Sequence, residues 1–198
     1  MLSVVIATHN HERPLVRTLA SLVPASMAGL VADVVIADAG STDDTARVAD
    51  AGGCEFLQLS APRGERLMQA AQHARAKWLL FLAPGVALEP GWVQEANAFL
   101  QDAWATPRGE TRTATFRVAR SAFAKPRLAD LVHVARQNIL GQMLLRPHPQ
   151  QGLIISKAHY LELGGHAIEA SHPEIDLLAR LGRGASVLLN AKVFAPEI

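Results

Sequence analysis

The sequence predicts an α/β fold in which a mainly parallel, Rossmann-like sheet is flanked by helices. Short apolar segments alternate along the chain with longer segments of helical periodicity, as βαβ units require. Strands are expected at residues 2–7, 32–37, 54–59 and 78–82, and helices at 11–23, 43–51, 64–76 and 90–102. The second of these strands ends in a lone carboxylate, Asp38, at the edge where such folds bind ligands.

Glycine and proline residues mark the ends of several elements. Gly52 and Gly53 end the second helix as a carboxyl cap, and Pro90 suits the first turn of the fourth helix. Residues 111–118 are expected to form a strand, and residues 128–145 an amphipathic helix. The remaining elements expected are a strand at 152–156, a helix ending at Gly164-Gly165, a helix near 173–181 and a strand near 185–194.

The composition is that of a folded protein. Hydrophobic residues make up 49% of the 198 residues and charged residues 19%, which excludes a disordered chain. The single cysteine, Cys54, excludes a disulfide framework and a multi-cysteine metal site. No basic leader precedes the first strand, and no apolar run has membrane-spanning length, so we expect a cytoplasmic protein.

Positive charge is concentrated in one segment. Residues 108–147 hold eight Lys or Arg and two Asp or Glu, which gives this segment a net charge of +6, against +1 for the whole chain. Such a segment can make peripheral contact with an anionic membrane surface or with phosphates. The alternative is a solvated loop and helix face. We expect no nucleic-acid partner.

The segment with the most information is 33–45, which reads DVVIADAGSTDDT. It combines an apolar strand, the carboxylate of Asp38, a tight Gly40-Ser41 turn and a helix start. The two oxygens of Asp38 can accept hydrogen bonds from a ribose hydroxyl or a nucleobase N–H. The alternative is an aspartate that only shapes the turn.

Three segments of the first half resemble the amino-terminal half of family-2 glycosyltransferases. They are LSVVIATHN at 2–10, a helix carrying LASL at 19–22, and DAGSTDDT at 38–45. The segments APRGERLMQ, WLLFL and EPGW, at 61–69, 78–82 and 89–92, are similar to the small members that accompany radical-SAM and selenium-domain proteins. The resemblance covers residues 2–100 well and is patchy from 150 to 182. It implies a GT-A fold over a single domain, 1–198, with a nucleotide-binding half at about 1–105 and an acceptor-side half at about 106–198.

The resemblance implies that the nucleoside of a nucleotide sugar, most simply a UDP-sugar, is held by Thr8, Asn10 and Asp38. Arg63 and Arg66 lie one turn apart at the start of the third helix and are further nucleotide-binding candidates. The alternatives are a solvated helix-start residue for Arg63 and an ion pair with a nearby carboxylate for Arg66.

The chain departs from the family at the metal motif. Relatives place Asp-x-Asp after the fourth strand, where a carboxylate binds Mn²⁺ or Mg²⁺. Here Ala83-Pro84-Gly85 follows that strand, so we expect no metal site at 83–85, and a divalent cation held elsewhere is the alternative. Arginines are then expected to stabilise the leaving diphosphate; the candidates are Arg63, Arg66, Arg117 and Arg120.

Two other metal candidates are weak. Glu89 is the next carboxylate after 83–85, but it matches a family position with a structural role. His9 and His11 have alternating spacing but lack a third ligand.

A general base is expected near 174. The family carries a Glu-Asp pair before a helix that ends in Arg-Leu, and alignment on Arg180-Leu181 places the Asp at Glu174 and the Glu at Pro173. Glu174 is therefore the first candidate for the base and Asp176 the second. The alternatives are stabilisation of the helix dipole and a role on the helix surface.

The resemblance places Gln151, Gly164 and Gly165 on the acceptor side. Together these features predict a glycosyltransferase that transfers sugar from a nucleotide to an unspecified acceptor without the usual metal motif. The rival is a catalytically inactive GT-A module that keeps a nucleotide or partner site. A nucleotidyltransferase is disfavoured because no Gly-rich basic loop follows the first strand.

Overall fold

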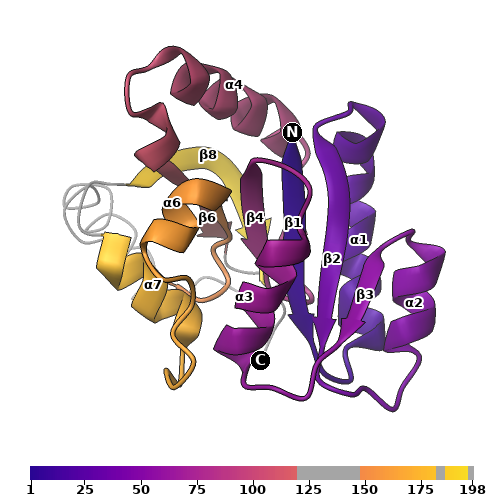
Figure 1. The fold of residues 1–198 in the computed structure, drawn as a ribbon. Helices are drawn as coiled ribbons and strands as arrows, with labels where there is room; N and C mark the ends of the chain where they lie inside the picture. Colours follow the sequence, from indigo (N-terminus) through magenta and orange to yellow (C-terminus); the bar gives the residue numbers. More distant parts are fainter. Residues whose placement is uncertain (120–147, 182–185, 196–198) are drawn as a thin grey trace, which may run out of the picture.

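A computed structural model describes residues 1–119, 148–181 and 186–195 of the chain. Its centre is an eight-stranded sheet of order β3-β2-β1-β4-β7-β6-β8-β5, flanked by helices (Figure 1). The strands are β1 (Leu2–Thr8), β2 (Val31–Asp38), β3 (Glu55–Gln58), β4 (Trp78–Leu82), β5 (Ala87–Leu88), β6 (Thr113–Ala119), β7 (Leu153–Ser156) and β8 (Ser186–Phe194). The α-helices are α1 (Glu12–Met27), α2 (Thr45–Ala51), α3 (Arg63–His73), α4 (Trp92–Ala105), α6 (Lys157–Glu162) and α7 (Pro173–Leu181).

The four amino-terminal strands form the parallel part of the sheet. β1 pairs in parallel with β2 and β4, and β2 pairs in parallel with β3. β7 is antiparallel to both β4 and β6, whereas β6 and β8 are parallel, so four of the seven described pairings are parallel. The predicted α/β class and mainly parallel sheet are confirmed.

Helices cover both faces because the strands are apolar on both. Val4 and Ile6 of β1 face a core with residues of α1, α2 and α4. Val5 and Ala7 face the opposite core, which contains residues of α3, α6 and α7. Near-continuous burial of β1 follows from this arrangement, since a parallel strand between two helical layers has no solvated face.

Several element ends differ from the sequence prediction. α1 continues past 23 to Met27, because Pro24 removes only one helical N–H while its own carbonyl still accepts from Ala28. The helix expected at 64–76 ends at His73, since Ala74 has extended backbone. The two-residue β5 and a 3₁₀ turn, η1 (Gly109–Thr111), were not predicted. The helix expected at 128–145 lies outside the described residues, as does Arg120.

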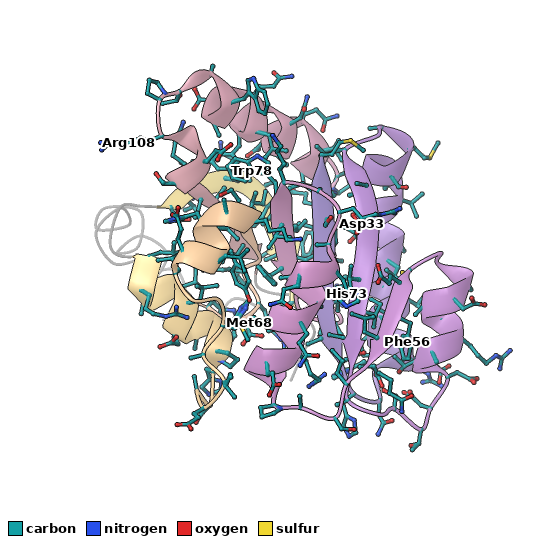
Figure 2. The ribbon with its side chains drawn as sticks, viewed as in Figure 1. Asp33, Phe56, Met68, His73, Trp78 and Arg108 are labelled. Atoms are coloured by element: carbon teal, nitrogen blue, oxygen red, sulfur yellow. The ribbon has the colours of Figure 1, made fainter. Side chains whose placement is uncertain are left out.

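The parallel strands all run in one direction, so their carboxyl ends meet at one edge of the sheet. Thr8 and Asp38 end neighbouring strands in register there. α3 lies on the face of the sheet that also carries α6 and α7. Met68 lies on the side of α3 toward these two helices (Figure 2). No described helix is long and apolar enough to cross a bilayer.

Candidate functional site

The Asp38 carboxylate is buried and fully engaged at the end of β2. It is 1% exposed and accepts four hydrogen bonds, two from hydroxyls and two from backbone N–H groups. The donors are Thr8 Oγ1 at 2.8 Å, Gly40 N at 2.8 Å, Ser41 N at 2.6 Å and Ser41 Oγ. Since a carboxylate offers about four acceptor positions, Asp38 here builds the turn, which is the alternative that the sequence left open.

The pKa of Asp38 follows from its burial and from these four hydrogen bonds. Burial alone would raise the pKa of the carboxyl, but hydrogen bonds from Ser41, Thr8 and Gly40 outweigh it and lower the pKa below its ordinary value. Asp38 is therefore ionised near neutral pH, and its charge is held by a preformed shell of donors.

Asn10 ties the turn after β1 to the turn after β2. It has a left-handed backbone with φ of 54°. Its Oδ1 accepts from Thr42 N at 2.8 Å, and its own N–H donates to Ser41 Oγ at 2.7 Å. The side-chain amide nitrogen has no partner among the described residues, and Asn10 is exposed. The exposed amide of this rigid pair of turns is thus available to a ligand.

Arg66 lies beneath the same edge and is 7% exposed. Its guanidinium donates to the carbonyls of Thr8 at 2.9 Å and Ala37 at 2.7 Å, and Nε donates to the carbonyl of Ala61 at 3.1 Å. Burial, and next Arg63, lower its pKa. The ion pair with a carboxylate, which was the alternative for Arg66, is absent from these contacts. Arg66 instead joins the ends of β1 and β2 and places a positive charge under the edge.

Arg63 and Glu174 form an ion pair between α3 and α7. Arg63 Nε and Nη2 lie 2.7 Å and 2.6 Å from Glu174 Oε1. The glutamate side chain is 17% exposed and the arginine 35%. A candidate for the nucleotide side and the candidate base therefore meet directly, although 111 positions separate them in the sequence.

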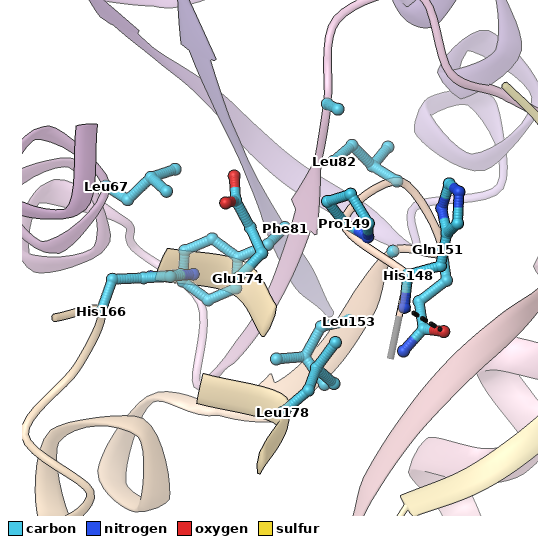
Figure 3. Close-up of a pocket in the computed structure, with 12 residues that line it drawn as sticks. Leu67, Phe81, Leu82, His148, Pro149, Gln151, Leu153, His166, Glu174 and Leu178 are labelled. Atoms are coloured by element: carbon cyan, nitrogen blue, oxygen red, sulfur yellow. Dashed lines mark hydrogen bonds between the residues drawn. The ribbon is translucent and has the colours of Figure 1, made fainter. Parts of the chain in front are cut away.

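Glu174 also lines a small cavity of about 20 Å³, together with Phe81, Ala83, Gln151 and His166 (Figure 3). Gln151 Oε1 accepts from the backbone N–H of His148 at 3.3 Å on the opposite side of this cavity. The cavity has room for about one water-sized group. It brings Gln151, a predicted acceptor-side residue, and Glu174, the first candidate base, into one site beside Ala83, which stands where relatives carry the metal motif.

Asp176, the second candidate base, does not line this cavity. Its carboxylate pairs with Arg180 one turn later at 2.8 Å, and its side chain is 38% exposed. Arg180 also donates to the carbonyls of Leu163 and Gly165. Asp176 thus supports Arg180, which fastens α7 to the end of α6.

The Gly164-Gly165 turn ends α6 as predicted and aims the next residue inward. Both glycines have positive φ, 78° and 68°. A Cβ on Gly165 would lie 3.2 Å from the Tyr160 hydroxyl and 3.3 Å from Met68, so the close approach and the φ both favour glycine. The turn places His166, which the sequence analysis missed, in the cavity wall. Its one sequence signal is its position directly after the two glycines.

Gly64 allows α3 to touch the segment after His166. A Cβ at Gly64 would lie 2.2 Å from the carbonyl oxygen of Ala167. We expect Gly64→Ala to lower the free energy of unfolding by about 1–3 kcal/mol, as overpacking does. Chemical denaturation measures it, with Glu65→Ala on the same helix as a control. Equal stability of the Gly64→Ala variant and the wild type would contradict this contact.

The carboxylates and histidines considered as metal ligands have other partners in the part of the chain that the structure describes. The described residues contain no group of three His, Cys, Asp or Glu side chains that could hold one. Glu89 accepts from Lys192 N at 3.0 Å and so joins the β5 region to β8. His11 Nδ1 accepts from the His9 backbone N–H at 2.9 Å, which occupies one ring nitrogen of that histidine pair.

Two larger hollows lie at the opposite, amino-terminal edge of the parallel strands. They measure about 470 and 650 Å³ and share Trp78 and Trp104 in their walls. Their larger volume does not make them the candidate ligand site, because α/β sheets bind their ligands at the carboxyl ends of the strands. The polar turns, the buried arginine and the ion pair all lie at that carboxyl edge.

Solved structures with the same architecture are glycosyltransferases. TarS 1-349 from S. aureus has a TM-score of 0.72 at 15% identity, covering 98% of this chain and 60% of that one. Glucosyl-3-phosphoglycerate synthase from Mycobacterium tuberculosis has a TM-score of 0.66 at 20% identity, covering 100% of this chain and 72% of that one. At these identities the likeness shows the GT-A fold. The chain spans about 60% of the TarS fragment.

Comparison with curated proteins finds no match. The association with radical-SAM and selenium-domain proteins stays a prediction. The family model described as glycosyl transferase family 2 matches residues 3–123 of the sequence, which is more than half of the chain. The chain belongs to glycosyltransferase family 2.

Proposed function

We propose that the protein binds a nucleotide sugar at the carboxyl edge of its sheet and transfers the sugar to an acceptor hydroxyl. The observation that carries this proposal is the Arg63–Glu174 pair, which joins α3 to the small cavity that residues of both halves of the chain line. The reaction requires two charged groups: a cation that stabilises the departing diphosphate and a carboxylate that takes the proton of the acceptor hydroxyl.

The proposed step balances as a displacement at the anomeric carbon. The acceptor oxygen forms a bond to that carbon while the bond to the diphosphate breaks, and the nucleoside diphosphate leaves with the electron pair. Glu174 takes the acceptor proton. Arg63 contacts the diphosphate, for which a guanidinium has suitable bidentate geometry. Arg66, whose donors hold backbone carbonyls, contributes its positive field.

The nucleoside is proposed to lie on the two joined turns. Asn10 offers its exposed amide, while Thr8 and Asp38 hold the turn in place from below. Structures of S. aureus TarS hold UDP and UDP-GlcNAc, and those of the mycobacterial synthase hold UDP with phosphoglyceric acid. These ligands of structural neighbours support a UDP-sugar as the donor.

A catalytically inactive binding module is the second candidate function. Two observations favour it: Arg63 occupies the carboxylate of Glu174, and no acidic residue stands at 83–85. Hydrolysis of UDP-sugars by the purified protein separates the two functions, because only an enzyme releases UDP at a rate that Glu174→Gln lowers.

UDP binding is expected to be independent of divalent metal. Ala83, Pro84 and Gly85 offer no carboxylate, so the diphosphate charge must be met by arginines. UDP and UDP-GlcNAc should raise the melting temperature equally in Mn²⁺ and in EDTA, with adenosine diphosphate as the control nucleotide. Stabilisation by UDP in Mn²⁺ alone would overturn the arginine-based account.

We also propose that the protein is cytoplasmic and that residues 108–147 contact an anionic membrane surface. Within the described part of that segment, Arg112 pairs with Asp102, whereas Arg108 and Arg117 are exposed. Residues 120–147 lie outside the described residues.

A further inference from the structure

His166 is a buried histidine with one ring nitrogen at the Glu174 cavity. The residue is 1% exposed and packs edge-on against Phe81, with ring centroids 4.7 Å apart. Its Nδ1 lies 2.8 Å from the Tyr160 hydroxyl. Its Nε2 has no hydrogen-bond partner among the described residues, yet it is not sealed off from the cavity. Figure 3 shows His166, Phe81 and Glu174 on the same side of the cavity.

The hydrogen bonds of Tyr160 favour one of the two positions for the proton on the His166 ring. The tyrosine is fully buried, and its hydroxyl accepts from the backbone N–H of His166 at 3.2 Å. The hydroxyl proton has one acceptor among the described residues, which is His166 Nδ1. Because Nδ1 accepts that proton, the proton of the neutral imidazole is on Nε2.

The ring is held in its neutral form. Burial, and then the charges of Arg63 and Arg180, lower the pKa of His166 to about 3. Nε2 is therefore a hydrogen-bond donor without positive charge over the physiological range.

We propose that His166 binds the acceptor, donating from Nε2 to the hydroxyl oxygen whose proton Glu174 removes. The cavity is about the size of one water molecule, and its lining includes His166, which can donate, and Glu174, which can accept. A hydroxyl group fits both, since it accepts one hydrogen bond while donating another. The ligand class is thus an alcohol, such as a sugar or glycerol-type hydroxyl. This inference rests on the proposed transfer function.

The first test is spectroscopic and needs no turnover. In protein labelled with ¹⁵N-histidine, His166 should show the neutral tautomer with the proton on Nε2 down to pH 5. Addition of glycerol with UDP should shift the Nε2 resonance. Tyr160→Phe, which removes the partner of Nδ1, should lose the preference for this tautomer. A proton on Nδ1, a protonated ring at pH 6, or an Nε2 resonance that glycerol leaves unmoved would each overturn the assignment.

The second test separates binding from packing. With glycerol as acceptor, His166→Phe should raise KM for glycerol about tenfold, the worth of one hydrogen bond, and leave UDP affinity unchanged. His166→Gln, which keeps a side-chain N–H donor, should recover most of the loss. Equal KM values in all three proteins would contradict the inference. If no protein transfers sugar, the proposed function fails, whereas the spectra still decide the role of His166.

Discussion

Replacing Glu174 with Gln is expected to lower sugar transfer about 10²–10⁴-fold, the usual worth of a general base. Glutamine keeps the size of the side chain but cannot take the acceptor proton. UDP-sugar affinity should not fall, because the variant leaves Arg63 free for the diphosphate. Steady-state turnover and calorimetry with UDP measure the two effects separately.

Asp176→Asn is the matched control for this prediction. Asp176 lies two positions along α7 and pairs with Arg180 at the helix surface. Its amide variant should therefore retain turnover close to the wild type. Wild-type turnover in both variants would show that neither carboxylate of α7 acts as the general base. Parallel losses of turnover and UDP affinity in Glu174→Gln would indicate a structural role for the carboxylate.

Asp38→Ala is expected to weaken UDP binding by about 1–3 kcal/mol, since it leaves one buried and three half-buried donors without their acceptor and releases the turn that carries the nucleoside site. Asp44→Ala is the control, because its carboxylate is exposed and pairs with Arg47 in the first turn of α2. Calorimetry with UDP compares both variants. Wild-type affinity in a folded Asp38→Ala protein would contradict a nucleoside site on this turn.

The pH dependence of stability gives a second measurement for Asp38. A carboxyl whose pKa is lowered by folding stabilises the protein above its ordinary value, 3.8, and this contribution is lost as the pH falls through the folded pKa. The wild type should thus lose stability more steeply in acid than Asp38→Ala. If the unfolding free energies of both proteins fell equally with pH in acid, the result would contradict the stabilisation of ionised Asp38 by these hydrogen bonds.

The sequence predicted the parallel half of the sheet well, because local patterns determine it. Apolar runs such as 78–82, and the glycines that follow helices, indicate strands and helix ends without knowledge of the neighbours. The two-residue β5 escaped prediction because it exists only through pairing with β8, which lies about a hundred positions later. A strand of two residues is too short to show the alternation of apolar and polar residues by which strands are predicted.

The site was predictable only in part for a similar reason. The positions of Thr8 and Asp38 at one edge follow from their places at the ends of neighbouring strands. The Arg63–Glu174 pair and the His166–Tyr160 contact depend on how α3, α6 and α7 pack against one another. Whether Asp38 faces a ligand or its own turn is decided by hydrogen bonds of the Gly40-Ser41 backbone, which residue types alone do not reveal.

The most direct measurement is a titration of the ¹⁵N-labelled protein with UDP, followed through its backbone amides. The account predicts saturable shifts at Asn10, Gly40, Ser41 and Arg63, which surround the carboxyl edge between the joined turns and the Arg63–Glu174 pair. Amides beside Trp104, at the opposite edge, should stay unmoved. Shifts confined to the Trp104 hollow, or no shifts at all with UDP, would contradict the nucleotide site.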